Sequence, residues 1–186
     1  MPQGIIEKLY EEHATLSDYL GRQEEPSFKQ LVTDNFRKTL ALSVASLFEN
    51  LITDAVLKFC EIRGGGDPGL ICLVRMKAVE KQYFKYFDWD NKSANHFYSM
   101  FGDPFGVSMK AEVKANPELK RGCEAFLELG YMRNCLVHQN FATFSFEKTA
   151  EEVYAEYRDA EKFVSYLVSR LSLNTKENTA NIPGAQ

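Results

Sequence analysis

The sequence predicts an all-α protein, a mostly up-and-down helical bundle of about five main helices. Apolar residues recur with the helical period of about 3.6 residues, and alternating strand patterns are nearly absent. A chain of 186 residues with 45% hydrophobic residues is long enough for one domain with its own core and too short for two. We therefore expect a single helical domain over residues 1–173 and a flexible polar tail over 174–186.

Three helices are expected in the first half of the chain. The first covers about residues 4–20 and stops near Gly21. The second runs over roughly 28–62 and should be the central helix, because apolar residues occur on two of its sides. A glycine-rich segment at 64–69 lacks the Gly-Lys-Ser/Thr ending of a phosphate cradle, so we interpret it as a connector. It leads into a third helix over about 70–87.

The second half is predicted to hold two longer helices after a long irregular connection. Residues 88–116 lack periodicity, so this connection should carry one or two short helices. Pro117 suits the first turn of a helix that reaches about residue 139. Thr149-x-x-Glu152 is a capping box at the start of the last helix, whose apolar face is Val153, Tyr157, Ala160, Val164, Leu167, Val168 and Leu171.

Charge and composition exclude several classes of protein. The net charge is −4, and it comes from residues 1–26, where six acidic residues face two basic ones. An overall basic footprint for nucleic acid is missing, so a nucleic-acid function would need a local site. We predict no membrane-spanning segment and no secretory signal, and hence a cytoplasmic protein without a membrane partner.

Neither a metal ion nor a cofactor is expected to take part in the function. None of the three histidines has a second His or Cys at ligand spacing. His13 and His96 are expected to be surface residues. The cysteines form no Cys-x-x-Cys pair and are typical of small buried hydrophobes without disulfides: Cys60, Cys72, Cys123 and Cys135.

The most informative side chains lie in residues 131–138. At about 100° per residue, Arg133 and Asn134 fall on the apolar arc of their helix. A buried, unpaired guanidinium costs on the order of several kcal/mol, so Arg133 should meet an internal carboxylate, a subunit interface or an anionic ligand. Asn134 and His138 are four residues apart and share a face, so the amide could orient the imidazole.

Arg133 and His138 are five residues apart, which is about 140° around the helix axis. They can converge on one phosphate only if Arg133 curls toward His138 or a second subunit supplies part of the site. Gly130 could also kink the helix. Two structural alternatives stay open. His138 could interact with the last carbonyls of its helix, and Arg133 could form an internal salt bridge, for instance with Glu49.

A basic stripe is expected on the third helix, where Lys77, Lys81 and Lys85 are spaced four residues apart. Such a stripe could bind the phosphates of RNA while exposed rings stack on unpaired bases. The alternative is a solvated helix face beside aromatic residues of the core. The aromatic residues concerned are Tyr83, Phe84, Tyr86, Phe87 and Trp89.

Residues 133–138 (RNCLVH) resemble the Arg-x(4 to 6)-His signature of HEPN domains, in which a polar residue, often Asn, commonly follows the arginine. The resemblance covers about 28–172, and Glu49 is similar to an acidic position of some HEPN branches. It implies a metal-independent endoribonuclease, usually a homodimer with two motifs facing each other across an interface cleft. Such proteins often act as toxins or in anti-phage defence. The implied partners are RNA, a second copy and a protein inhibitor or antitoxin.

The chemistry of these residues agrees with that implication. Metal-free RNA cleavage needs proton transfer, for which a histidine is suited, and stabilisation of charge on phosphorus, which a guanidinium supplies. We therefore expect His138 to act as acid or base, Arg133 to bind the phosphate and transition state, and Asn134 to orient His138 or the phosphate. The products would be a 2′,3′-cyclic phosphate and a 5′-hydroxyl. The alternative is a catalytically silent helical module for dimerisation, nucleotide binding or regulation of a partner.

Overall fold

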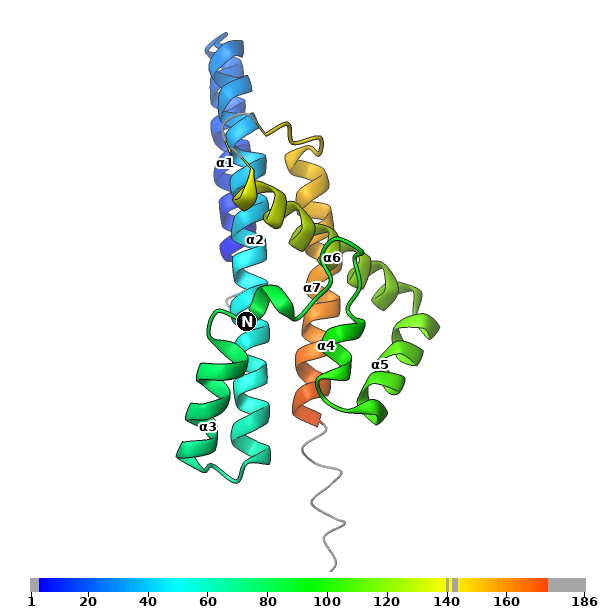
Figure 1. The fold of residues 1–186 in the computed structure, drawn as a ribbon. Coiled ribbons are helices and arrows are strands. Elements are labelled where there is room, and N and C mark those ends of the chain that lie inside the picture. The colour runs from blue at the N-terminus through cyan, green and yellow to red at the C-terminus, as the bar shows by residue number, and fades with distance from the viewer. Residues whose placement is uncertain (1–3, 140, 142–143, 174–186) are drawn as a thin grey trace, which may run out of the picture.

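The computed structural model describes residues 4–139, 141 and 144–173, and these parts of the chain form a helical bundle (Figure 1). The predicted all-α fold is confirmed. The predicted polar tail, 174–186, lies outside the described residues. The α-helices are α1 (Ile5–Arg22), α2 (Pro26–Arg63), α3 (Pro68–Val74), α4 (Asn95–Ser99), α5 (Asp103–Ala115), α6 (Pro117–His138) and α7 (Ala150–Leu173), with a π-helical turn η1 (Arg75–Val79) and a 3₁₀ turn η2 (Tyr83–Lys85).

The central helix is α2, as the sequence predicts. It pairs with α1 in a hairpin whose far end projects beyond the other helices, while α6 and α7 pack on the middle of α2 (Figure 1). The lower end of α2 carries α3, and α4 and α5 lie beside α6 and α7. The residues of α2 that are buried by these neighbours include Leu40, Ala41, Val44, Phe48, Ile52, Ala55 and Val56.

By length and composition alone, α2 is also apolar enough to cross a membrane. Its most apolar window has a mean hydropathy of 1.5, and 39% of that window is buried in the bundle. Apolar residues on more than one side are what a helix at the centre of a helical core requires. The expected absence of a membrane partner stays a prediction.

The starts of α6 and α7 agree with the sequence signals. The Asn116 side chain accepts hydrogen bonds from two backbone amides in the first turn of α6, and Pro117 lies in that turn. The predicted capping box is present: the Glu152 amide donates to the Thr149 hydroxyl, and the Thr149 amide donates to the Glu152 carboxylate. α6 and α7 approach closely at Gly122 of α6, where a Cβ would lie 2.6 Å from a backbone oxygen of α7. No larger residue fits there without moving one of the helices.

The predicted helix over 70–87 is wrong beyond its first turns. α3 and η1 end at Val79, and the chain turns at Lys81, whose φ of 58° is in the left-handed region. In a straight helix, Tyr83, Tyr86, Phe87 and Trp89 would spread over about 160° of its surface. The break lets four rings enter the core, each at most 8% exposed: Tyr83, Tyr86, Phe87 and Trp89.

The connection over 88–116 is more helical than predicted. It contains the short helix α4 and also α5, which has 13 residues. Pro104 lies in the first turn of α5, where its missing N–H leaves no helical bond unmade. The proline therefore starts a helix instead of interrupting one.

Trp89 joins the aromatic segment to α6. Its ring packs on the helix backbone at Gly130, where a Cβ would lie only 1.9 Å from Trp89 Cζ3. Trp89 Nε1 donates a hydrogen bond of 3.0 Å to the Phe84 carbonyl, and the ring of Phe126 lies beside the indole with centroids 5.7 Å apart. α6 runs unbroken through Gly130 to His138. The glycine makes room for the indole.

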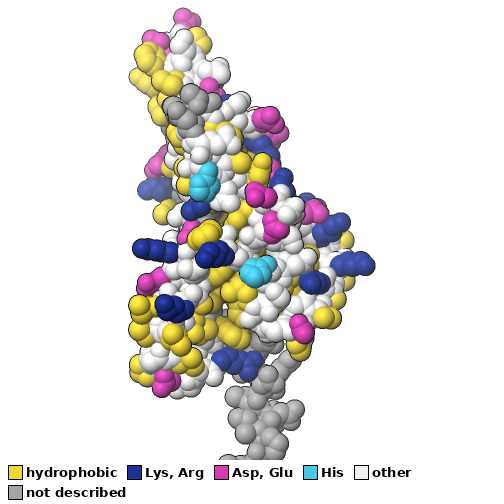
Figure 2. All heavy atoms as spheres, viewed as in Figure 1, with side chains coloured by type: hydrophobic (Ala, Val, Ile, Leu, Met, Phe, Trp, Pro, Cys, Tyr) yellow, Lys and Arg dark blue, Asp and Glu magenta, His cyan; other side chains and the backbone are white. Residues whose placement is uncertain are grey.

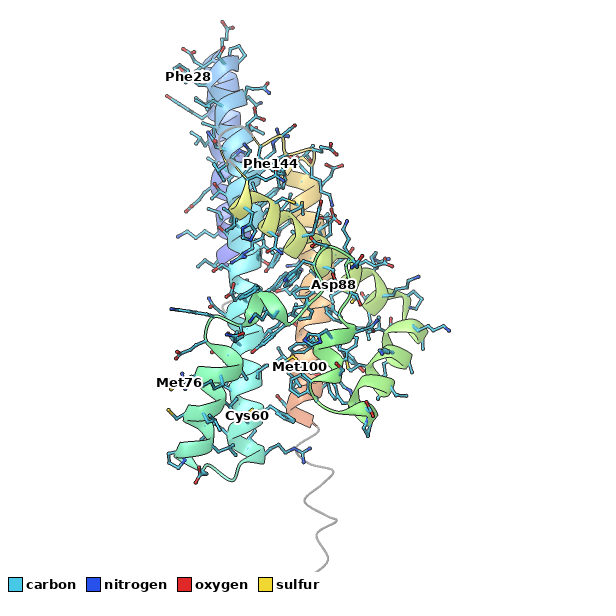
Figure 3. All side chains as sticks on the ribbon, in the orientation of Figure 1. Phe28, Cys60, Met76, Asp88, Met100 and Phe144 are labelled. Carbon is cyan, nitrogen blue, oxygen red and sulfur yellow. The ribbon has the colours of Figure 1, made fainter. Side chains whose placement is uncertain are left out.

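The four cysteines are free thiols. Cys123 is buried as predicted, and Cys60 and Cys135 are half-buried. Cys72 is exposed, so the prediction of burial is wrong there. The reason is that α3 packs on one end of α2 and leaves its other face open, on the side where Met76 also points outward (Figure 3).

Replacing Gly130 by alanine should destabilise the fold, because the added methyl group overlaps the Trp89 ring. Overpacking of a filled core costs about 1–3 kcal/mol, and we expect that loss in the free energy of unfolding measured with urea. The single tryptophan of the chain reports the transition by fluorescence.

Gly21→Ala is the matched control for Gly130→Ala. Gly21 also lies in a helix, but its Cβ would meet only the flexible end of Lys29, at 3.4 Å. This variant should be neutral, or stabilised by up to about 1 kcal/mol through helix propensity. Equal losses in the two variants would contradict the role given to the Trp89 contact.

Glu7 connects the start of α1 with α7. Its carboxylate accepts hydrogen bonds from the Gly4 amide, from the Tyr157 hydroxyl and, at 2.8 Å, from Arg158. Partial burial alone would raise the pKa of Glu7, but these bonds and one from its own backbone amide outweigh that effect and lower the pKa below 4.5.

Glu7→Gln should therefore lower stability in a pH-dependent way. A carboxylate whose pKa is lower in the folded than in the unfolded state contributes stability above the unfolded pKa, and loses it as the pH falls through the folded pKa. We expect a deficit of about 0.5–1.5 kcal/mol near pH 7 that shrinks as the pH falls through the lowered pKa of Glu7 and is smaller at about pH 3. Urea denaturation at both pH values measures it. Glu11→Gln, an exposed change in the same helix, should show no such deficit, and a deficit of Glu7→Gln that persists in acid would argue against the ionic contribution.

Candidate functional site

Three segments of the chain meet around the C-terminal half of α6. They enclose an open cleft of about 420 Å³. α6 contributes the three residues predicted as catalytic, α2 contributes one acidic residue, and the turn between η1 and η2 contributes the opposite wall. The residues that line the cleft are Arg133, Asn134, His138, Glu49, Lys81, Tyr83 and Phe84.

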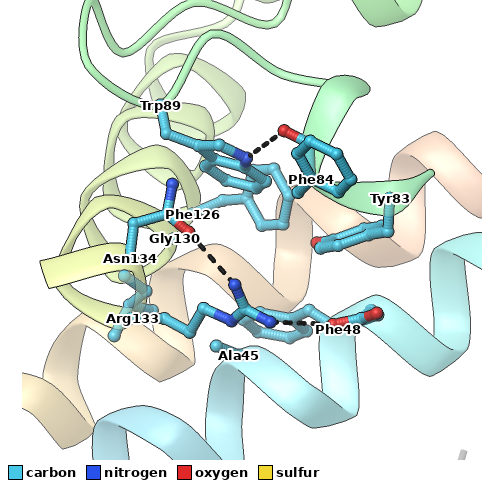
Figure 4. A pocket seen from close by; sticks show the side chains of 11 residues that line it. Ala45, Phe48, Tyr83, Phe84, Trp89, Phe126, Gly130, Arg133 and Asn134 are labelled. Atoms are coloured by element: carbon cyan, nitrogen blue, oxygen red, sulfur yellow. Dashed lines mark hydrogen bonds and ion pairs between the residues drawn. The ribbon is translucent and has the colours of Figure 1, made fainter. Parts of the chain in front are cut away.

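Arg133 lies over an aromatic floor at one side of this cleft (Figure 4). Its Nη1 donates a hydrogen bond of 3.2 Å to Asn134 Oδ1, and its Nη2 lies 4.0 Å from a carboxylate oxygen of Glu49. The cavity below the guanidinium holds only about 10 Å³, roughly the room of one water molecule. Arg133 is thus supported from below, and its side chain is still 32% exposed.

The internal salt bridge considered as an alternative is present in a weak form. A separation of 4.0 Å is too long for a hydrogen bond, and the Glu49 side chain is 38% exposed. Ion pairs of this kind contribute about 0–1 kcal/mol. Since a guanidinium has five N–H donors, this contact with Glu49 and the bond to Asn134 leave donors of Arg133 for an anionic ligand.

Asn134 makes a contact that the sequence did not predict, and its expected role in orienting His138 or the phosphate stays a prediction. Its side-chain oxygen accepts the bond from Arg133, so it orients the guanidinium. His138 is the last residue of α6, and its side chain is exposed at the mouth of the cleft. This position is also compatible with the alternative of a histidine at a helix C-terminus.

Tyr83 forms part of the floor beside Arg133 and Glu49. Burial raises the pKa of Tyr83 well above its usual range, and the Glu49 carboxylate adds to this effect while Arg133 opposes it. The hydroxyl therefore stays protonated at neutral pH. Figure 4 shows it directed to the side of the pocket where Arg133 lies.

The expected basic stripe is not continuous. Lys77 lies in η1, Lys81 in the left-handed turn and Lys85 in η2, so the three exposed lysines do not share one helix face. Lys81 lines the cleft, whereas Lys77 and Lys85 do not. Figure 2 shows lysine and arginine side chains gathered over this part of the surface. Binding of RNA by the three lysines stays a prediction.

The other two histidines lie apart from this cleft. His96 is exposed on α4, as predicted. His13 was expected at the surface, but it is half-buried, because its ring stacks on Phe36 with centroids 3.7 Å apart. Burial lowers the pKa of His13. In the described ranges 4–139, 141 and 144–173, no three His, Cys, Asp or Glu side chains gather where a metal ion could bind.

Lys38 supports the site and was not identified from the sequence. It lies in α2 and is only 7% exposed. Its Nζ donates a hydrogen bond of 2.8 Å to the Phe141 carbonyl and lies 5.2 Å from the centre of the Phe141 ring. Because Phe141 follows His138 by three residues, Lys38 fixes the chain where it leaves α6. Helical spacing could have indicated its burial, because Lys38 lies three residues before Ala41 and seven before Ala45, which are both buried.

Lys38→Met should destabilise the protein, because it leaves the Phe141 carbonyl without its lysine donor. Phe141 is 37% exposed, so water can partly replace the lysine, and the loss of this hydrogen bond should cost about 0.5–1.5 kcal/mol, measured as the free energy of unfolding in urea. Lys58→Met is the control, since Lys58 is an exposed residue of the same helix and should change stability by less than about 0.5 kcal/mol. Equal stability of the two variants would show that the Lys38 contact does not hold this segment.

Comparison with protein families identifies the kind of domain. A model of the RiboL-PSP-HEPN family matches residues 7–173, which includes the acidic helix α1. Comparisons with curated proteins and with solved structures give no match. The family match agrees with the all-helical fold and with the HEPN resemblance of residues 133–138. The chain therefore belongs to the RiboL-PSP-HEPN family of HEPN domains.

Proposed function

We propose that this protein is a metal-independent endoribonuclease whose complete site forms between two copies of the chain. HEPN domains are often ribonucleases, and they commonly bind RNA and dimerise. The observation that carries the proposal is that Arg133, Asn134 and His138 line one solvent-accessible cleft together with Glu49. The sequence resemblance adds a toxin or anti-phage role, restrained by a protein inhibitor, to the same proposal, and the sequence-based expectation of a cytoplasmic location belongs with it.

In the proposed reaction, the ribose 2′-oxygen attacks the adjacent phosphorus and the bond from phosphorus to the 5′-oxygen breaks. One imidazole accepts the 2′-hydroxyl proton, and an acid returns a proton to the departing 5′-oxygen. The products are a 2′,3′-cyclic phosphate and a 5′-hydroxyl. The N–H groups of Arg133 stabilise the negative charge that builds on the phosphoryl oxygens, and Asn134 holds the guanidinium in place.

The number of proton-transfer groups supports a dimeric site. Base and acid act on opposite sides of the phosphorus, and His138 is the one imidazole that lines the described cleft. Tyr83 is only 8% exposed, and its raised pKa makes the hydroxyl a poor base and a weak acid at neutral pH. A second copy facing the cleft would supply the second imidazole. This arrangement removes the need for Arg133 and His138 of one chain to cover the about 140° between them alone.

Glu49 gives the cleft a resting state without ligand. Its contact with Arg133 is long and partly exposed, so a phosphate with two charged oxygens can displace it at small cost. The same contact favours the second candidate function, a catalytically silent module, because an arginine paired with a carboxylate can be structural. Cleavage assays separate the two candidates.

Purified protein should cleave single-stranded RNA in the presence of EDTA and leave 2′,3′-cyclic phosphate ends. His138→Ala should reduce the rate about 10²- to 10⁴-fold through loss of proton transfer. Arg133→Ala should reduce it about 10²- to 10³-fold through loss of charge stabilisation. Denaturing gels and mass spectrometry of the fragments measure rate and end chemistry.

His96→Ala is the control for the histidine variant, because His96 is exposed on α4 and does not line the cleft. It should cleave at the rate of the parent. Cleavage that survives both His138→Ala and Arg133→Ala would eliminate this mechanism. A parent protein that binds nucleotides but cleaves no RNA would support the silent module instead.

A further inference from the structure

Phe84 differs from the aromatic residues around it. Its ring is 54% exposed, although its neighbours Tyr83, Tyr86 and Phe87 are each at most 8% exposed. A single exposed phenylalanine is ordinary on a protein surface. What distinguishes Phe84 is its place, because it lines both the cleft and the cavity below Arg133.

The backbone of Phe84 is fixed by the core. Its carbonyl accepts the 3.0 Å hydrogen bond from Trp89 Nε1, and Trp89 is packed against Gly130 of α6. Phe84 also lies in the turn η2 directly after the buried Tyr83. The backbone that carries the Phe84 ring is thus fixed against α6 about one turn before Arg133 (Figure 4).

The surroundings of the ring suit a nucleotide. Lys85 Nζ lies over one face of the Phe84 ring, 5.3 Å from its centre, which leaves the other face for a base, and Lys81 lines the cleft with Phe84. Lysine binds phosphate as a point charge, and a phenyl face accepts the flat face of any base. In an RNA duplex the bases are already stacked on each other, so a ring of this kind can be reached only by an unpaired base.

We infer that Phe84 is a stacking platform for an unpaired base next to the phosphate bound by Arg133, with Lys81 on the neighbouring backbone phosphate. The inference rests on the proposed function, in which the cleft takes RNA. It adds where an unpaired base of the substrate lies, and it predicts little preference among the four bases, because a ring face stacks on any of them. Phe84 acts as a residue that positions the substrate, while His138 and Arg133 do the chemistry.

Binding is measured in the His138→Ala background, so that cleavage does not enter the result. The probe is a short single-stranded RNA with 2-aminopurine in place of adenine. Its anisotropy, read from a terminal dye, gives the affinity, and quenching of 2-aminopurine reports stacking. Phe84→Leu should weaken binding roughly 5- to 100-fold and reduce the quenching, whereas Phe84→Trp should keep both. The same RNA as a duplex should bind weakly and respond little to either change.

Phe28→Leu is the matched control. Phe28 is 58% exposed at the far end of the α1–α2 hairpin (Figure 3), roughly 30 Å along α2 from Glu49. It should bind like the background protein. Phe84→Leu with unchanged affinity and quenching would overturn the inference. So would a loss of binding that accompanies a change of oligomeric state in size-exclusion chromatography, because Phe84 would then be an interface residue.

The two proposals fail separately. If the parent cleaves RNA and Phe84→Leu binds and cleaves like the parent, the platform is wrong and the ribonuclease proposal stands. If the parent cleaves no RNA while binding in the His138→Ala background depends on Phe84, the platform stands and the ribonuclease proposal is wrong.

Discussion

The packing of Trp89 on the α6 backbone is the constraint on which the site depends. A side chain at position 130 would overlap the indole, so glycine there lets the aromatic segment lie directly against α6. The hydrogen bond from Trp89 to the Phe84 carbonyl then fixes the turn that forms the opposite wall of the cleft. Arg133 follows Gly130 on the same helix. One contact therefore determines both the helix position that carries the motif and the wall that faces it.

Features with a local cause were predictable from the sequence. α6 begins at Pro117 after an Asn cap, and α7 follows the capping box of Thr149 and Glu152, because both signals act within a single turn. The helix that was expected over 70–87 depends on distant contacts instead. Lys81 has a left-handed backbone conformation, and four rings are buried against other helices. Together these outweigh the helical spacing of that segment, and no local sequence pattern predicts them.

In the candidate site, too, some features follow from the sequence pattern and others depend on contacts between distant parts of the chain. Helical periodicity placed Arg133 and Asn134 on the buried side of α6, and both line the cleft. Periodicity could not show that the Asn134 oxygen bonds to Arg133, because the rotamers of adjacent side chains depend on the surrounding wall. Lys38 was missed for a related reason: its partner is a backbone carbonyl 103 residues away, and a lysine in an apolar stripe has no fixed partner until the fold is known.

The electrostatics of the cleft connect these contacts with binding. The Glu49 carboxylate lies 4.0 Å from Arg133 and partly compensates the charge of the guanidinium. This lowers the free-energy cost of holding the guanidinium above an aromatic floor. The contact is weak because both side chains are partly solvated. In the proposed function, a phosphate brings more charge and better geometry than this carboxylate and replaces it beside Arg133. A carboxylate at this distance therefore stabilises the guanidinium, and the weakness of the contact is what the proposed binding of an anionic ligand requires.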